Sequence, residues 1–192
     1  MKPCSSEDRL EQAVRTILDE IGVEKGSETY RNTPRRVAKM YLELFSGMDE
    51  RNEPKMTLFS NTGYNDIIAV KKIPFYSVCA HHMLPIFGDV SVAYIPGEKI
   101  VGLSKIPRVV KFFSLRLQVQ ENFSEQIADY LLTKLNAKGV FVLVKARHLC
   151  LEMRGVTMPN VETVSSTARG IFETSQAKRE EALQMMMIDG NP

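Results

Sequence analysis

Apolar residues near the start of the chain recur every three or four positions, at Leu10, Val14, Ile17 and Ile21. This spacing places them on one face of an α-helix, and the serines and acidic residues just before them are typical of a helix N-terminus. A second helix is expected from Thr33-Pro34 to about Gly47, because threonine caps helices and proline suits the first helical position. Residues 49–65 are polar and contain a proline and a glycine. We therefore predict an N-terminal helical region with a linker over residues 1–65.

The pattern changes near residue 67, where short runs rich in β-branched and aromatic residues begin. These runs cover residues 67–73, 75–78, 90–95, 100–103, 140–144 and 162–172. Helical stretches are expected near residues 106–113 and 123–135 and from about residue 175. Strands, then helices, then strands again are typical of an α+β domain with an antiparallel sheet. We expect this domain to cover residues 66–192.

Composition and charge exclude some classes of protein. Of the 192 residues, 44% are hydrophobic and 25% are charged, as in an ordinary globular domain. A formal net charge of +2 gives no field that would attract nucleic acid or a membrane surface, so neither is expected as a partner. The sequence has no apolar signal core and no segment long enough to span a bilayer. We expect a cytoplasmic protein whose three cysteines stay reduced.

All three histidines and two of the three cysteines fall in two short windows, Cys79-Ala80-His81-His82 and His148-Leu149-Cys150. Thiolate and imidazole are the ligands that a borderline-soft ion such as Zn²⁺ prefers. A structural zinc site is closed by four protein ligands, whereas a catalytic site has three and an open position. The two windows hold five candidate ligands, which is more than either kind of zinc site needs. We favour three ligands on the metal and two imidazoles beside it for proton transfer, which predicts hydrolytic chemistry; a closed structural zinc site is the alternative.

The spacing within each window narrows the choice of ligands without settling it. Cys79 and His82 can converge if the chain turns between them. His148 and Cys150 are two residues apart, so on a strand they point to the same face. One residue of this pair can then bind the metal while the other faces the same cavity.

Several motifs follow one another along the chain: Cys79-Ala80-His81-His82, Ala93-Tyr94-Ile95-Pro96, Gly102-Leu103-Ser104-Lys105, Gln118-Val119-Gln120-Glu121, and His148-Leu149-Cys150 with Arg154-Gly155. Their order resembles that of the zinc-dependent GTP cyclohydrolase I family, and the similarity runs from about Thr33-Pro34 to Phe172. The resemblance implies the tunnelling fold, an antiparallel four-stranded sheet backed by two helices, with an N-terminal helical extension. It also implies a homo-oligomer, in which subunits join edge to edge into pentameric barrels and two barrels stack as a decamer.

The resemblance implies a reaction as well. The guanine imidazole ring of GTP is opened by hydrolysis, formate is released, and 7,8-dihydroneopterin triphosphate is formed. A zinc ion would be held by Cys79, His82 and Cys150. The acid–base imidazoles would be His81, which protonates nitrogen 7, and His148, which serves the later proton transfers with Ser104.

The remaining roles concern binding of the substrate. By resemblance, Gln120 and Glu121 meet the N–H groups of the guanine. A triphosphate carries several negative charges and needs a cluster of basic side chains. The resemblance supplies Lys105, Arg108, Arg154, Arg36 and Lys39.

One position departs from the family pattern, which usually reads Cys-Glu-His-His where this chain has Ala80. Loss of a carboxylate beside metal ligands can cost tenfold or more in affinity or activity. A non-catalytic or weakly active zinc-containing paralogue, acting in assembly or regulation, is therefore the alternative to an active enzyme. Ser104, Glu121 and both spare imidazoles favour the enzyme, because a structural zinc site needs none of them. A pterin synthase with an all-histidine zinc site, or a nitrile reductase with a cysteine nucleophile, fits the mixed ligand set less well.

Overall fold

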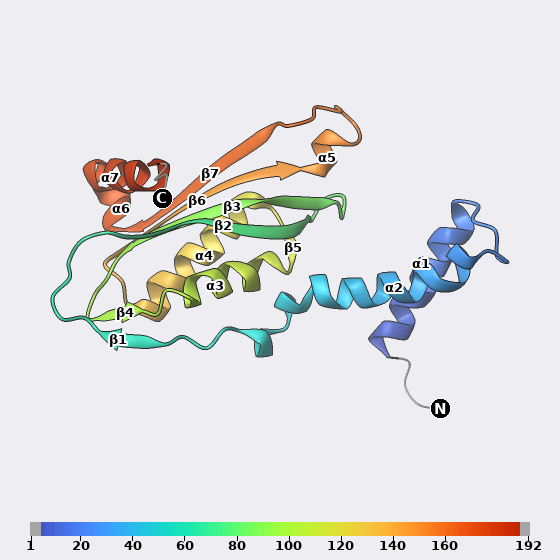
Figure 1. Cartoon of the computed structure of the whole chain (residues 1–192), viewed down its shortest axis with the longest axis horizontal. Helices are drawn as coiled ribbons and strands as arrows, with labels where there is room; N and C mark the ends of the chain where they lie inside the picture. Colours follow the sequence, from blue (N-terminus) through green and yellow to red (C-terminus); the bar gives the residue numbers. More distant parts are fainter. Residues whose placement is uncertain (1–4, 189–192) are drawn as a thin grey trace. The chain divides into compact units, whose positions relative to one another are not determined.

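Figure 1 shows the computed structural model of the chain, in which residues 5–188 are described. The chain divides into two compact units, one ending at Ser46 and one beginning at Gly47. The sequence pattern places this boundary at residue 65 instead. Residues 58–60 of the expected linker form a strand, β1, that pairs with a strand of the second unit. This pairing is why the segment belongs to the second unit.

The first unit is a hairpin of two helices, α1 (Ser6–Glu20) and α2 (Glu28–Leu44). Ser5 caps α1: its hydroxyl accepts the N–H of Asp8, and the Asp8 carboxylate accepts the N–H of Ser5. Val14 and Leu18 are the buried residues of α1. Of the apolar residues that the spacing places on one face, Val14 is buried, whereas Ile17 and Ile21 are 57% and 68% exposed. The spacing therefore predicts the helix, but only part of its buried face.

Helix α2 begins earlier than the sequence indicates. Its cap is Ser27, whose hydroxyl accepts the N–H of Tyr30 at 3.1 Å, so the predicted start at Thr33-Pro34 is wrong. Pro34 inside the helix has no N–H to donate to the carbonyl four residues earlier, that of Tyr30. The guanidinium of Arg15 in α1 donates to this carbonyl at 3.4 Å. A contact between the two helices therefore offsets the hydrogen bond that proline removes.

The second unit is an α+β domain whose main sheet has the strand order β5-β2-β3-β6-β7. Its long strands, β2 (Ile68–Cys79), β3 (Pro85–Ile95), β6 (Gly139–His148) and β7 (Glu162–Gly170), pair antiparallel. The two-residue β5 (Leu117–Gln118) adds in parallel to the end of β2. The other elements are η1 (Ser46–Met48), η2 (Glu50–Asn52), β1 (Leu58–Ser60), β4 (Lys99–Val101), α3 (Lys105–Ser114), α4 (Gln120–Leu135), α5 (Leu149–Glu152), α6 (Ile171–Thr174) and α7 (Gln176–Met187). No helix within residues 5–188 is long and apolar enough to cross a membrane.

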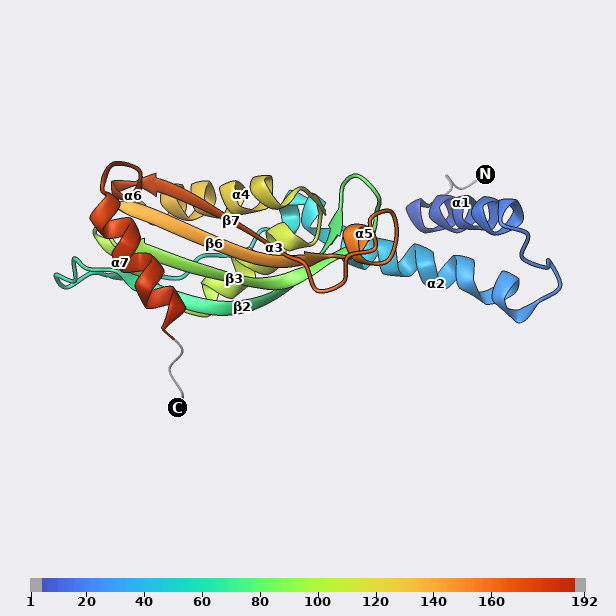
Figure 2. The same cartoon turned by 90° about the horizontal axis from the view of Figure 1, so that it is seen from above.

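The sheet has a hydrophobic core on each face. Val140, Val142 and Val144 of β6 belong to the larger core, which they form with residues of α3 and α4. Phe141 and Leu143 belong to the smaller core, with residues of α6 and α7, the helix that crosses the strands in Figure 2. Successive side chains of a strand point to opposite faces. Burial on both faces is therefore the reason why residues 140–144 are apolar without interruption.

The two edges of the main sheet are open. Among the described residues, β7 pairs only with β6, and the outer edge of β2 pairs with β5 only at Val78 and Cys79. Unpaired strand edges present backbone N–H and C=O groups to any strand that can add to them.

Gly88 of β3 is expected to tolerate no side chain. A Cβ atom there would lie 2.0 Å from the carbonyl oxygen of Lys145 and 2.8 Å from the Cα of Ala146 on β6. Gly88→Ala should therefore lower the free energy of unfolding by about 3 kcal/mol, which urea denaturation would measure. Gly102→Ala is the matched control, because its nearest contact would be 3.5 Å. A Gly88→Ala protein as stable as this control would contradict the close approach of the two strands.

Candidate metal centre and active-site pocket

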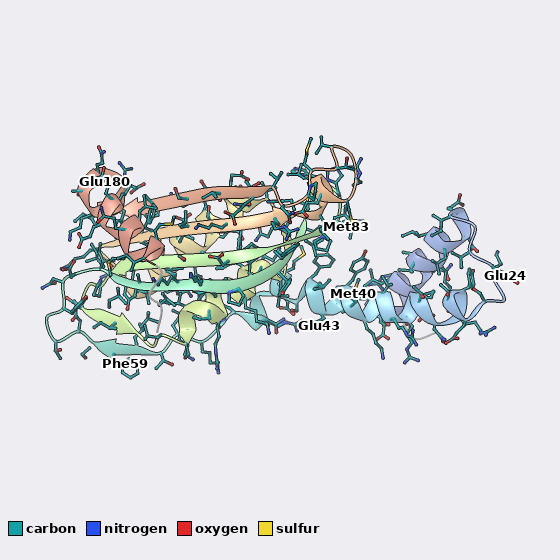
Figure 3. The ribbon with its side chains drawn as sticks, turned by 45° about the horizontal axis from the view of Figure 1, so that its top comes forward. Glu24, Met40, Glu43, Phe59, Met83 and Glu180 are labelled. Atoms are coloured by element: carbon teal, nitrogen blue, oxygen red, sulfur yellow. The ribbon has the colours of Figure 1, made fainter. Side chains whose placement is uncertain are left out.

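The first ligand window forms the turn between β2 and β3. Cys79 is the last residue of β2 and is 4% exposed. Its N–H donates to the carbonyl of Leu84 at 2.8 Å, and its carbonyl accepts the N–H of Met83, labelled in Figure 3, at 2.9 Å. These two hydrogen bonds close the turn. As a result, the Sγ of Cys79 lies 3.8 Å from Nδ1 of His81 and 4.0 Å from Nδ1 of His82.

The second ligand window lies where β6 ends. Strand β6 pairs with β3 so that His148 is opposite Ile86, close to the first turn. The chain then leaves the strand and enters α5, so Cys150 lies in a helical turn. The expectation that Cys150 continues a strand beside His148 is therefore wrong. The ligand atoms of Cys79, His82 and Cys150 nevertheless all lie within 4.8 Å of one another.

These three ligand atoms suit a cation. Burial raises the pKa of the Cys150 thiol, and the neighbouring Cys79 raises it further, because two adjacent thiolates repel each other. A divalent cation between them would reverse this direction by favouring the thiolates. Two sulfur atoms and one imidazole nitrogen also form a donor set that Zn²⁺ and similar ions prefer, with a coordination position left open. The residues present therefore fit a metal ion.

The cluster opens onto a pocket of about 260 Å³. The pocket is lined by Cys79, His81, His82, Ile86, Gln118, Val119, Gln120, Glu121, His148, Cys150, Leu151 and Thr163. The fold thus brings the two ligand windows and the first turn of α4, with Gln120 and Glu121, to one place. Ala80 of the same turn is exposed, and its N–H donates to the carbonyl of Gln118 at 2.9 Å.

Sequence reasoning missed the contribution of β7 to this pocket. Thr163 lines the cavity, and the hydroxyl of Ser165 receives a hydrogen bond from the Gln120 side chain. The hydroxyl residues Thr163, Ser165 and Thr167 alternate along the strand and so lie on one face of it. This alternation is the signal that could have indicated a polar strand face.

His148 is held by one strong hydrogen bond. Its Nε2 lies 2.8 Å from Oε1 of Gln120. Burial lowers the pKa of His148, and the carboxylate of Glu121 opposes this with a smaller effect. Burial at this place therefore favours the neutral imidazole over the imidazolium ion.

Three other predicted residues lie away from this pocket. Ser104 precedes α3, and Lys105 and Arg108 belong to its first turns. Strand β4 lies just before these residues, and the N–H of Val101 in it donates to the hydroxyl of Tyr94. Tyr94 pairs with Ile68 at the start of β2. The pocket is at the other end of β2, across roughly 35 Å of extended strand. One copy of the chain therefore does not bring these three residues to the metal cluster.

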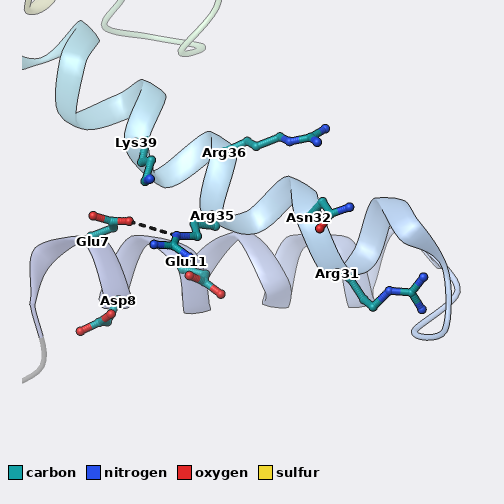
Figure 4. Close-up of a pocket in the computed structure, with 8 residues that line it drawn as sticks. All are labelled: Glu7, Asp8, Glu11, Arg31, Asn32, Arg35, Arg36 and Lys39. Carbon is teal, nitrogen blue, oxygen red and sulfur yellow. Dashed lines mark ion pairs between the residues drawn. The ribbon is translucent and has the colours of Figure 1, made fainter.

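The last predicted residues are Arg154, Arg36 and Lys39. Arg154 follows α5 and lies near enough to Cys150 to lower the pKa of its thiol slightly. Arg36 and Lys39 belong to the first unit, where a polar cavity of about 790 Å³ lies between α1 and α2 (Figure 4). Its lining consists of Glu7, Asp8, Glu11, Arg31, Asn32, Arg35, Arg36 and Lys39. Of these, Arg35 pairs with Glu7 at 3.6 Å.

A cysteine–histidine cluster open to a pocket, with further imidazoles and a carboxylate beside it, has the arrangement of a catalytic metal centre. The chain belongs to the GTP cyclohydrolase I family, whose sequence model matches residues 10–187. It is 44% identical to the GTP cyclohydrolase 1 of Carboxydothermus hydrogenoformans over 93% of this chain and 94% of that protein. Identity to the proteins of the same name is 41% for Streptococcus thermophilus (94% of this chain, 97% of that protein) and 43% for Brevibacillus brevis (93% and 96%).

Proposed function

We propose that this protein opens the guanine imidazole ring of GTP by hydrolysis, releases formate and forms 7,8-dihydroneopterin triphosphate. The observation that carries the proposal is the convergence of Cys79, His82 and Cys150 with His148 and Glu121 around one pocket. Membership of the GTP cyclohydrolase I family supports it across nearly the whole chain.

The metal of this site would be Zn²⁺, held by Cys79, His82 and Cys150. The chemistry that zinc supplies when bound is activation of water near neutral pH. The two remaining imidazoles line the same pocket and move protons: His81 protonates nitrogen 7 of the guanine, and His148 serves the later transfers. Glu121, in the first turn of α4, accepts hydrogen bonds from guanine N–H groups.

The triphosphate would be bound in part by residues that the second unit of one chain does not gather. Arg154 lies near the metal cluster. The proposed catalytic residue Ser104 and the proposed triphosphate contact Lys105 lie toward the other end of β2. Arg108 follows Pro107, which lines a cavity beside the middle of β2. Arg36 and Lys39 would contribute from the helical hairpin. A complete active site therefore requires a second copy of the chain.

The open edges of β2 and β7 support such an assembly. An apolar pocket of about 310 Å³ lies between the edge of β2 and α3, lined in part by Phe75, Tyr76 and Leu115. Near the other edge, apolar side chains such as Met158 and Val164 are exposed. Joining of unlike edges can close into a ring, and the expected assembly is a decamer of two pentameric rings.

The experiment that tests the proposed function is direct. Purified zinc-loaded protein is incubated with GTP, and formate and a fluorescent oxidised pterin are measured. Appearance of both in a one-to-one ratio is expected. GTP that remains intact after prolonged incubation, with the metal site filled, would contradict the proposed function.

The two kinds of histidine are expected to respond differently to substitution. His82→Ala should lose metal and activity together. His81→Ala and His148→Ala should keep the metal and lose roughly 10²–10⁴ in rate, because their imidazoles move protons. Elemental analysis and turnover of the same preparations check this. A metal-free His81→Ala protein with a metal-loaded His82→Ala protein would reverse the ligand assignment.

A further inference from the structure

Gln120, which the resemblance assigns to guanine binding, directs its side-chain amide to partners inside the protein. It is the first residue of α4, and the residue is only 3% exposed although it lines the pocket. Every polar atom of its amide has a partner inside the protein. A buried amide with this many fixed partners has one orientation, since turning it would leave buried polar groups unpaired.

The partners identify which end of the amide is which. One end lies 3.0 Å from the carbonyl oxygen of Thr163 and 3.3 Å from that of Val144, and 3.1 Å from the hydroxyl of Ser165. Carbonyl oxygens only accept hydrogen bonds, so the donating NH₂ group must be at this end. The amide oxygen Oε1 is then the end that faces His148.

The amide oxygen in turn determines the protonation of the imidazole. Oε1 lies 2.8 Å from Nε2 of His148. An amide oxygen can only accept, so Nε2 must carry the hydrogen. In the neutral ring the lone pair is then on Nδ1, the nitrogen that remains able to accept a proton.

We infer that Gln120 is a positioning residue, which holds His148 as the Nε2–H tautomer and leaves Nδ1 as the nitrogen that exchanges protons with the substrate. The inference rests on the proposed function for the identity of the substrate, and on the hydrogen-bond geometry for the tautomer. The amide is anchored to β6 and β7 through Val144 and Thr163, so the imidazole is oriented by the sheet itself. Such orientation contributes to the reaction rate, because a base that points away from the substrate cannot exchange protons with it.

Two variants separate this role from a structural one. Gln120→Met and Gln120→Glu both lose the NH₂ group that bonds β6 and β7, but only the glutamate keeps an oxygen that can accept from Nε2 of His148. Gln120→Met should lower kcat roughly tenfold to a hundredfold, with KM for GTP and zinc content within about twofold of wild type. Gln120→Glu should recover most of the rate.

Two kinetic outcomes would overturn the inference. Equal losses in both variants would show that Gln120 only joins the strands. A rise in KM with unchanged kcat in Gln120→Met would show that its side chain serves to bind guanine.

A second measurement does not depend on turnover. The chain has three histidines, so solid-state ¹⁵N spectra of histidine-labelled protein contain few signals, and a His148→Asn sample assigns those of His148. Wild type should show a protonated Nε2 and an unprotonated Nδ1, and Gln120→Met a mixture of tautomers. A protonated Nδ1 in the wild type would refute the inference. Failure of wild type to convert GTP, with the expected spectrum, would refute the proposed function and leave the tautomer assignment standing.

Discussion

Cys150→Ala is expected to abolish GTP turnover and to leave the fold intact. Cys150 is one of the three residues whose ligand atoms lie within 4.8 Å of one another. Removing one of two thiolates from a three-ligand site leaves too few donors to hold a zinc ion tightly. The side chain lies in a short surface helix outside the main core residues, which it only contacts. The expected loss of activity is therefore at least about a thousandfold, with little change in secondary structure.

The measurement combines elemental analysis, circular dichroism and the pterin fluorescence assay. Cys4→Ala is the matched control: Cys4 is outside the described residues and outside both ligand windows of the sequence. It should keep one zinc per subunit and full turnover. A Cys150→Ala protein that retains zinc and activity would contradict the metal site as a whole.

Mixing two inactive variants is expected to restore activity. Cys150→Ala removes a metal ligand at one end of the sheet, and Lys105→Ala removes a proposed triphosphate contact from the start of α3, at the other end. If a site draws these residues from different subunits, random co-assembly leaves both intact in roughly a quarter of the sites, because each contribution is intact about half the time. Co-expression of the two variants, followed by the pterin assay, measures this fraction.

The control is a mixture made after separate assembly, which should stay inactive if subunits do not exchange. A second control co-expresses wild type with a double variant that carries both substitutions. It measures the activity of mixed oligomers in which every intact residue comes from the wild-type chains. Zero activity from well-mixed Cys150→Ala and Lys105→Ala oligomers, with the double-variant mixture active, would show that both residues come from the same chain.

The sequence by itself indicated several of the elements and the residue types of the candidate site. The helical spacing from Leu10 to Ile21 predicted α1, and the uninterrupted apolar run at residues 140–144 predicted the strand that becomes the middle of β6. These patterns are readable because periodicity repeats within a few residues and needs no distant partner. The residue types in the two windows likewise indicated a metal, because few other uses gather cysteine and histidine so densely. Their binding of zinc stays a prediction.

Tertiary structure alone decided which atoms meet. Pro34 can lie inside α2 because Arg15, from another helix, donates to the carbonyl of Tyr30. Cys150 reaches Cys79 from a helical turn, and no local pattern distinguishes that from a strand. Gln120 is directed to His148 by carbonyls of β6 and β7, and pairing across the sheet separates Lys105 from the pocket. Each of these outcomes depends on residues far apart in the sequence, whose distances are set by strand register and helix packing, and a one-dimensional pattern carries no information on either.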